Sequence, residues 1–522
     1  VGKYGEIINS TFVDNSAMNA GAILVCDFAD NMKIINSSFT SNRATSSNGG
    51  AIEVWGPNAV ITSSNFTSSE AHDKGGAIAG FNVHNITISD LIIKFSEVSG
   101  FHDPDGTVHG EGGAIYLQNS NGLNITRITL YDNEAHLQGG SIALINCNDS
   151  TLSDMSIDMS SSQSYGGAIY WDSGKEGIII STSFINNNAT GNGGAIYFDG
   201  IDGKIGYSKF INNSAASGGA IYNVGSLTAN TNQFTNNTAA DGKNDIAGNG
   251  SVKYGVDFEF DVEDNVYGKT AKIHVNVTSN GKPVNGGNLS AVVNNVTYSA
   301  DVVNGVATLQ IPNLDGGSHD INIAYVPNDS NYNNRTELYA LVINKQNLVI
   351  TAKDAAYIIN YGGKYSITLK DLNGTAVAGE KVTFTLNGKA VGSAVTNANG
   401  VATISLTAKA LKSAKEGKKN MVIKLASNNY AASKTVKITI NKEKTKIAAK
   451  NKKFKKSKKT KKYTITLKNS KGKGVKKVKV TLKVKGKTYK AKTNAKGKAT
   501  FKIKKLTKKG KHIATIKFKG DA

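Results

Sequence analysis

The chain has 522 residues and a formal net charge of +23, and it contains 55 Gly but only 5 Pro and 2 Cys. No stretch approaches the roughly 20 consecutive apolar residues of a membrane-spanning helix. Residues 442–522 hold 33 Lys against two acidic residues, so the positive charge belongs to one end and the first 441 residues are net acidic.

The first half of the chain repeats a short motif built around Gly-Ala-Ile, with Ser in place of Ala once. Its glycines are Gly21, Gly50, Gly76, Gly113, Gly140, Gly167, Gly194 and Gly219, at spacings of 25 to 37 residues. Between them stands a second motif, Phe-x-x-Asn, which begins at Phe39, Phe184, Phe210 and Phe234. Such self-similarity at a fairly steady period indicates an array of stacked repeats.

Each repeat offers two or three short strands in which apolar and polar residues alternate, separated by Gly or Asn turns. A unit of about 26 residues cannot bury its apolar face alone, so one coil must stack on the next. We expect the Ile and Phe side chains inside, the glycines at a tight corner, and the Asn side chains in an amide ladder with a spacing of about 4.8 Å. The pattern predicts an all-β protein in which residues 1–248 form a right-handed parallel β-helix of about nine coils.

After residue 248 the repeated motifs stop. A turn-then-strand pattern recurs instead at residues 304–308, 399–403 and 496–500, at intervals of 95 and 97 residues. Units of this size, with short strands and frequent turns, predict tandem Ig-like β-sandwiches. Their expected ranges are 249–344, 345–441 and 442–522. A final strand at residues 436–440 of the second unit has no counterpart in the third, so we expect the third to be truncated and the chain to be a piece of a longer secreted protein.

The paired motifs Gly-Gly-Ala-Ile and Phe-x-x-Asn resemble the repeats of chlamydial polymorphic outer-membrane proteins. They are similar also to those of the large adhesin-like surface proteins of methanogenic archaea, which join such a β-helix to Ig-like domains. The motif Thr-Asn-Ala-x-Gly-x-Ala-Thr, at residues 396–403 and 493–500, resembles the Ig-like domains of bacterial invasin-type surface proteins. These resemblances imply an extracellular protein of the cell surface or cell wall that functions in adhesion.

Three successive coils carry a tyrosine directly after the repeated Ile, at Tyr170, Tyr197 and Tyr222. Strand alternation turns these side chains away from the Ile and therefore outward. An exposed aromatic strip of this kind could bind sugar rings by stacking. The alternative is a structural ladder that only stiffens the sheet.

The widest glycine spacing, 37 residues, marks an insertion that carries His102, Asp103, Asp105, His109 and Glu111. Three interpretations remain open, namely a polar surface loop, a loop that binds a ligand or metal, and a catalytic loop. Nothing in the sequence requires a cofactor. Among metals, the carboxylates favour calcium.

The lysines of residues 442–522 alternate with Val, Ile and Thr, as on an exposed sandwich face. This segment has no arginine, and its aromatic residues are not interleaved with the lysines. This pattern favours an anionic cell-wall polymer as the partner of the C-terminal domain and disfavours nucleic acid. Simple solubility is the alternative.

The two cysteines, Cys26 and Cys147, stand four repeats apart. On a stacked architecture they are too distant to form a disulfide. We expect both to be buried thiols.

We therefore expect a non-enzymatic surface protein whose β-helix presents a binding face to glycans or proteins of another cell, carried on an Ig-like stalk. One alternative is a polysaccharide lyase or hydrolase with Ig-like accessory domains. Such enzymes need clustered carboxylates and a base, yet Arg43 and Arg127, the only arginines of the predicted β-helix, adjoin no repeated acidic pair. A purely structural cell-wall protein is the other alternative.

Overall fold

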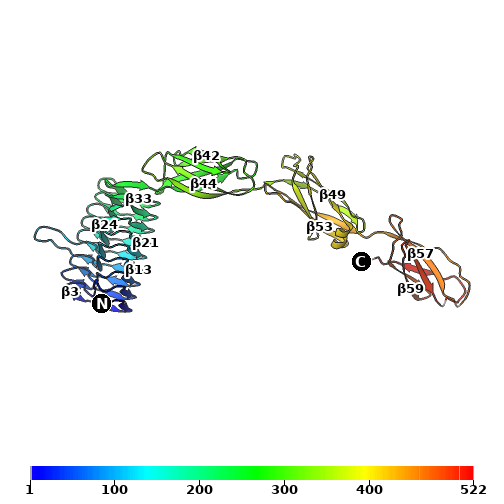
Figure 1. The fold of residues 1–522 in the computed structure, drawn as a ribbon, viewed down its shortest axis with the longest axis horizontal. Helices are drawn as coiled ribbons and strands as arrows, with labels where there is room; N and C mark the ends of the chain where they lie inside the picture. The colour runs from blue at the N-terminus through cyan, green and yellow to red at the C-terminus, as the bar shows by residue number, and fades with distance from the viewer. Residues whose placement is uncertain (1–2, 458, 505, 521–522) are drawn as a thin grey trace. The chain divides into compact units, whose positions relative to one another are not determined.

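The computed structural model describes residues 3–457, 459–504 and 506–520 (Figure 1). The chain divides into two compact units. The first runs to Asn265 and takes in Lys269–Pro312 and Ser318–Val342; the second holds Val266–Gly268, Asn313–Gly317 and the chain from Ile343 onward. Strands dominate the described residues, which contain a single short helix, α1 (Ala408–Ala414). The prediction of an all-β protein is confirmed.

The N-terminal half is a parallel β-helix in which each coil adds one short strand to each of four parallel sheets. The first sheet contains β1 (Glu6–Ile8), β5 (Lys33–Ile35), β9 (Val60–Thr62), β13 (Thr87–Ser89), β17 (Asn124–Thr126), β21 (Thr151–Ser153), β25 (Ile178–Ile180), β29 (Gly203–Gly206), β33 (Ser226–Asn230) and β37 (Ser251–Tyr254). The second contains β2 (Thr11–Val13), β6 (Ser38–Thr40), β10 (Asn65–Thr67), β14 (Ile92–Lys94), β18 (Thr129–Tyr131), β22 (Ser156–Asp158), β26 (Ser183–Ile185), β30 (Lys209–Ile211) and β34 (Gln233–Thr235).

The other two sheets complete the coils. The third contains β3 (Ser16–Ala17), β7 (Arg43–Ala44), β11 (Glu70–Ala71), β15 (Glu97–Val98), β19 (Glu134–Ala135), β23 (Ser161–Ser162), β27 (Asn188–Ala189), β31 (Ser214–Ala215) and β35 (Thr238–Ala239). The fourth contains β4 (Ile23–Val25), β8 (Ile52–Val54), β12 (Ile78–Phe81), β16 (Ile115–Gln118), β20 (Ile142–Ile145), β24 (Ile169–Lys175), β28 (Ile196–Ile201), β32 (Ile221–Asn223) and β36 (Ile246–Ala247). Three sheets thus have nine strands and one has ten, as a stack of about nine coils requires.

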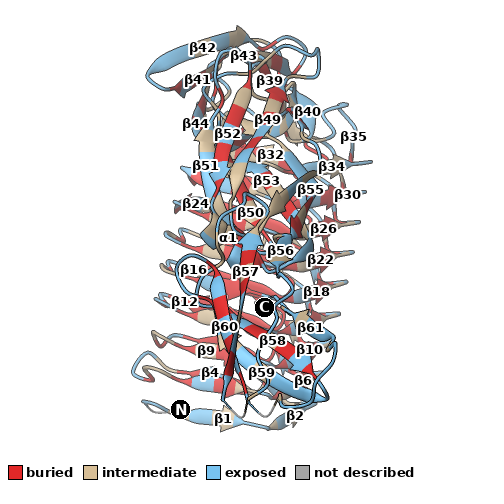
Figure 2. Ribbon diagram, turned by 90° about the vertical axis from the view of Figure 1, so that its right-hand side faces the viewer, coloured by how far each residue is buried: buried red, intermediate tan, exposed pale blue. Residues whose placement is uncertain are grey.

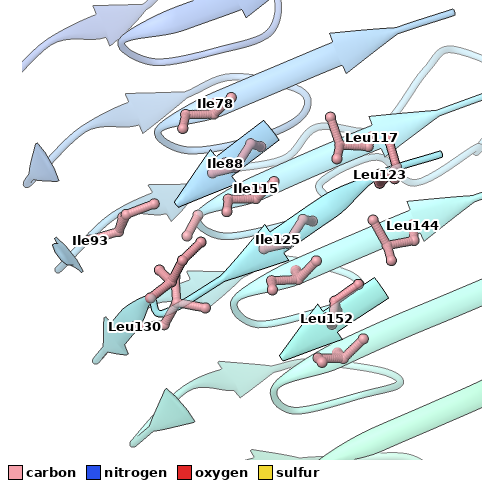
Figure 3. Close-up of a cluster of buried hydrophobic side chains, with 14 of the residues drawn as sticks. Ile78, Ile88, Ile93, Ile115, Leu117, Leu123, Ile125, Leu130, Leu144 and Leu152 are labelled. Carbon is pink, nitrogen blue, oxygen red and sulfur yellow. The ribbon is translucent and has the colours of Figure 1, made fainter. Parts of the chain in front are cut away.

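The side chains that the repeats share line the interior of the stack. Buried residues recur along every sheet of the stack (Figure 2), and in the fourth sheet β8, β12, β16 and β20 are buried on successive residues. Phe39 and Phe66 are fully buried with ring centroids 4.6 Å apart, and Phe184 and Phe210 form a second stacked pair at 4.8 Å. Isoleucines and leucines from the other strands fill the space between the walls (Figure 3). Burying each such side chain contributes about 1.5–3 kcal/mol, so every coil stabilises its neighbours.

The glycine pair forms the corner that the sequence predicted. Its first member adopts a positive φ, +65° at both Gly49 and Gly75, a conformation that other residues rarely accept. Its second member has no room for a side chain, because a Cβ at Gly76 would collide with the backbone oxygen of Gly113 in the next coil. Both positions therefore demand glycine, for different steric reasons.

The predicted amide ladder is also present. Asn187 Nδ2 donates to Asn213 Oδ1, and Asn213 Nδ2 donates to Asn237 Oδ1, both at 3.0 Å. The same oxygens accept the backbone N–H groups of Asn187 and Asn213 at 3.0 and 3.1 Å. The ladder therefore satisfies polar groups in the interior that would each cost about 1–3 kcal/mol if left unpaired.

Mainly antiparallel sheets follow the β-helix. The first pair of sheets contains β38 (Asp257–Glu263), β39 (Ala271–Ser279), β40 (Lys282–Pro283) and β43 (Val306–Ile311), then β41 (Asn288–Val293), β42 (Val296–Asp301), β44 (Gly317–Val326) and β45 (Arg335–Ile343). The second pair contains β47 (Val349–Thr351), β49 (Gly363–Lys370) and β52 (Val401–Leu406), then β48 (Ala355–Ile358), β50 (Lys381–Leu386), β51 (Lys389–Val395), β53 (Gly417–Leu425) and β55 (Ser433–Asn441). A short parallel pair joins β46 (Gln346–Asn347) to β54 (Tyr430–Ala431).

The third pair of sheets contains β56 (Thr445–Ala448), β57 (Lys461–Asn469) and β60 (Lys498–Ile503), then β58 (Lys479–Val484), β59 (Lys487–Lys492) and β61 (Ala514–Lys517). The second and third pairs each enclose a hydrophobic core, with Phe384 in one and Phe501 in the other fully buried. The antiparallel second half is confirmed. Its Ig-like character and the domain boundaries stay predictions, and the β-helix ladder itself continues to Tyr254 through the pairing of β33 with β37.

Only one cysteine is a buried thiol. Cys147 is fully buried, its Sγ lies 3.3 Å from the backbone oxygen of Leu117, and burial raises the pKa of the thiol to about 12. Cys26 is half-buried, so the prediction for it is wrong. It directly follows Val25, whose side chain lies inside the stack, and alternation therefore turns Cys26 outward.

Candidate functional site

The fourth sheet turns one face to the core and the other to the outside of the stack. Ile169 and Ile196 are fully buried inside, and the tyrosines that follow them belong to a separate outer cluster. The strands pair in register, so that Tyr170 lies opposite Tyr197 and Tyr197 opposite Tyr222. The three predicted tyrosines therefore form one column on the outer face.

The column is a continuous stack of rings. The ring centroid of Tyr197 lies 5.2 Å from that of Tyr170 and 5.7 Å from that of Tyr222, with interplanar angles of 24° and 13°. Tyr165, from the turn before β24, stacks on Tyr197 as well, at 5.0 Å. A sugar ring between two tyrosines would need a contact of about 3.5–4 Å on each side, so these spacings leave no room for one.

The prediction of an exposed strip is wrong for Tyr170, which is only 8% exposed. It belongs to the outer cluster together with Ala143 and Ile145 of β20 and Tyr165 of the turn, and these side chains cover it. Tyr197 and Tyr222 are half-buried, so part of each residue is open to solvent. Burial raises the pKa of Tyr197 to about 12, so this phenol keeps its proton at neutral pH and can donate a hydrogen bond.

Two carboxylates lie beside the tyrosines on the same outer face. Asp172 and Asp199 stand two residues after Tyr170 and Tyr197 and oppose each other in neighbouring strands. Desolvation, and then the charge of Asp172, raise the pKa of Asp199. Phenol donors thus stand next to carboxylate acceptors, a combination suited to hydrogen-bonding a ligand rich in hydroxyl groups.

The inserted loop folds into a small hairpin closed by a backbone bridge between His102 and Val108. His109, at its base, lies between two carboxylates. Its Nε2 is 2.9 Å from an oxygen of Asp103, and its Nδ1 is 3.4 Å from an oxygen of Asp73 in the preceding coil. The hairpin therefore folds back onto the stack instead of standing free.

Ring stacking also fixes the base of the hairpin. The ring of Phe101 lies between those of His72 and His109, with centroids 4.8 and 4.4 Å away and planes within 8° of parallel. Three rings from two coils thus form one packed column, which holds His109 in place.

A lysine links the hairpin to the outer face of the fourth sheet. Lys74 Nζ lies 2.8 Å from Asp73, 3.5 Å from Glu111 and 5.6 Å from the ring centre of Tyr116. Glu111 therefore has a cationic partner, and the charges around the loop are largely paired.

His102 and Asp105 stay apart from this group. His102 is exposed, and its ring lies edge-on to that of His136, with the two ring centroids 6.1 Å apart. Asp105 is exposed and accepts the backbone N–H of Thr107 at 3.0 Å, which lowers the pKa of its carboxyl. The predicted loop residues that the structure brings together are Asp103, His109 and Glu111.

The donor set of the hairpin does not suit a metal ion. In residues 3–457, 459–504 and 506–520, no group of three or more His, Cys, Asp or Glu side chains is placed to hold one. Asp103 faces His109 and Glu111 faces Lys74 instead, so these carboxylates are not arranged as calcium ligands.

A family model for the Chlamydia polymorphic membrane protein repeat matches residues 181–199 and 208–224. The β-helix repeat of this chain is similar to the repeat of that family. The match covers two coils, each with a Phe-x-x-Asn motif and the glycine corner that follows it, and these are a small part of the chain. The likeness to archaeal adhesin-like proteins stays a prediction, and a search of curated proteins found no match.

Solved structures with similar parts include three bacterial proteins. They are a calcium-stabilised adhesin that helps an Antarctic bacterium bind ice (14% identity, 52% of this chain, 74% of that chain, TM-score 0.17), the Escherichia coli adhesin FdeC (17%, 52%, 92%, 0.22) and fibronectin(III)-like modules of Clostridium thermocellum CbhA (16%, 35%, 95%, 0.17). Likenesses this weak assign no function. No helix in the described part of the chain has the length and hydropathy to cross a membrane.

Proposed function

We propose that the protein is an adhesin-like protein of the cell surface. In this proposal the outer face of the fourth sheet binds hydroxyl-rich ligands such as the polysaccharides of another cell. The observation that carries it is the placement of Tyr197 and Tyr222 beside Asp172 and Asp199 on one face, all four half-buried. We call these four residues the tyrosine–aspartate face.

The chemistry of the face suits hydrogen bonding better than ring stacking. The tyrosine faces cover one another, whereas the phenol groups donate and the carboxylates accept along the edge of the stack. Each contact is weak. A rigid β-helix loses little conformational freedom on binding, so contacts on successive coils add without a large ordering cost.

The similarity to the Chlamydia polymorphic membrane protein repeat supports a place at the cell surface. The antiparallel domains would then act as a stalk that carries the β-helix away from its anchor. We propose no catalysis at the hairpin. His109 is held by Phe101 and two carboxylates and Glu111 faces Lys74, so no free acid–base pair remains there.

Retention of the 522-residue chain on immobilised neutral polysaccharides tests this function. Neutral polymers keep the lysine-rich domain from contributing. Tyr197→Phe with Tyr222→Phe removes two hydroxyl groups and leaves the ring stack intact. Since a hydrogen bond contributes about 0.5–1.5 kcal/mol, we expect retention to weaken by about tenfold.

Tyr131→Phe with Tyr207→Phe is the matched control, because both rings lie outside the fourth sheet. It should leave retention unchanged. Equal retention of the two double variants would refute the proposed face. Absence of retention on every polysaccharide would favour a purely structural rod.

A further inference from the structure

The third pair of antiparallel sheets carries a basic groove. β59 and β60 follow each other in the chain but belong to different sheets, and a hollow of about 450 Å³ lies along them. Four lysines line it, and we call them the lysine groove: Lys490, Lys492, Lys498 and Lys502.

The four side chains point outward and have no acidic partner. On β60 the exposed Lys498 and Lys502 alternate with Ala499, Phe501 and Ile503, which are buried. In the part of the chain that the structure describes, no carboxylate forms an ion pair with a lysine of the groove. Four like charges close together repel one another, and nothing in the fold offsets that cost.

The second pair of sheets shows what the same fold uses at these positions. The turns correspond, because Asn494 Oδ1 accepts the N–H of Lys498 at 3.0 Å just as Asn397 Oδ1 accepts that of Val401 at 2.9 Å. Strand register gives the other equivalences. The matching positions are Lys490 and Ser393, Lys492 and Val395, Lys498 and Val401, and Lys502 and Ser405.

The fold therefore does not require lysine at any of the four positions. One domain of the chain places uncharged residues there, and the other places a cluster of unpaired cations on an equivalent framework. A ligand that supplies negative charge explains the difference, whereas folding does not.

We propose that the lysine groove binds a linear polysaccharide with repeated carboxylate or sulfate groups. Lysine is a compact cation on a flexible stem and suits such evenly charged polymers, whereas paired recognition of phosphate favours arginine. Tyr489, the one aromatic residue at the groove, packs into the core and donates its hydroxyl to the Lys504 carbonyl at 2.9 Å. It therefore offers no free ring face for nucleobases.

This site is separate from the tyrosine–aspartate face, which takes uncharged ligands. The groove variant is Lys490→Ser, Lys492→Val, Lys498→Val and Lys502→Ser, so each replacement is the residue of the second pair of sheets. The control variant replaces four exposed lysines elsewhere on the same domain, again with the residue at the matching position of the second pair of sheets. Its changes are Lys446→Val, Lys473→Thr, Lys476→Ala and Lys483→Thr. Both lower the net charge by the same amount, and far-UV circular dichroism checks that both are folded.

The unchanged 522-residue chain and both variants are titrated with polygalacturonate, dextran sulfate, uncharged dextran and a single-stranded DNA oligonucleotide at two salt concentrations. We expect the groove variant to bind one or both anionic polysaccharides about tenfold more weakly and with a shallower salt dependence, while the control variant stays within about twofold. The polymer that binds more tightly identifies carboxylate or sulfate as the group recognised.

Equal losses in the two variants would overturn the proposal, because binding would then depend on diffuse charge. Tighter binding of the DNA than of either anionic polysaccharide would also overturn it, in favour of nucleic acid. Binding of uncharged dextran as tight as that of the anionic polymers would show that charge is not what the groove recognises.

Discussion

Replacing Asn213 by alanine removes the middle of the buried amide ladder. Its Oδ1 accepts both the backbone N–H and the Nδ2 of Asn187, and its own Nδ2 donates to the carbonyl of Phe184. The alanine variant leaves the Asn187 N–H without this acceptor and the Phe184 carbonyl without this donor. At about 1–3 kcal/mol for each of these two stranded groups, the free energy of unfolding should fall by about 2–6 kcal/mol.

Asn188→Ala is the matched control, one residue from the ladder. The Asn188 side chain is exposed, and its Oδ1 accepts a hydrogen bond only from the surface hydroxyl of Ser214, at 2.6 Å. Exposed substitutions of this kind change stability by less than about 0.5 kcal/mol.

Urea unfolding followed by tryptophan fluorescence measures the difference. The chain has two tryptophans, Trp55 and Trp171, and both lie in the β-helix, so the signal reports that domain and not the antiparallel sheets. Trp171 is fully buried in β24. If Asn213→Ala and Asn188→Ala shift the midpoint equally, the ladder does not stabilise the stack as we infer.

Two further outcomes follow from the coil geometry. Partial desolvation, then the charges of Glu70 and Glu134 in the adjoining coils, raise the pKa of Glu97. Because the folded state then binds more protons than the unfolded state just above the usual carboxyl pKa, stability falls as pH rises through that window. Because Glu97 is exposed and solvent screens these charges, Glu97→Gln should raise the free energy of urea unfolding at pH 7 by less than about 1 kcal/mol and have little effect near pH 3. An unchanged free energy of unfolding at pH 7 would contradict this. Gly76→Ala should disrupt the corner against Gly113 and abolish the cooperative fluorescence transition, whereas a normal transition would show that the coils can separate to admit a Cβ.

Much of the β-helix could be predicted because each coil repeats the same structural demand. The glycine corner, the inward Phe and Ile, and the Asn ladder each occupy one position that recurs in register with its copy. A coil whose own motif is incomplete can therefore be assigned from the coils on either side of it. Strand alternation also could have revealed Asp172 and Asp199, which stand two residues after Tyr170 and Tyr197 and so share their face.

The burial of the tyrosine column could not be predicted in the same way. Part of what covers it comes from the turn position before the glycine pair, where the successive residues are Lys74, Glu111, Gln138 and Tyr165. That position carries no repeated residue type, so the sequence gives no signal for the side chain that packs there.

The hairpin posed a different difficulty. His109 meets Asp73 only because the insertion folds back across one coil, and the sequence does not specify the direction in which an inserted loop leans. The result is a packed, charge-paired hairpin in place of the open ligand loop that was one interpretation of the sequence.

Retention of the 522-residue chain on intact cells of several microbial species tests the proposed binding face most directly. The comparison is between the unchanged chain, Tyr197→Phe with Tyr222→Phe, and the groove variant of the third pair of sheets. A binding face on the β-helix predicts that the tyrosine variant loses retention on at least one species, while the groove variant keeps it there. Retention of the tyrosine variant equal to that of the unchanged chain on every species would contradict the proposed function.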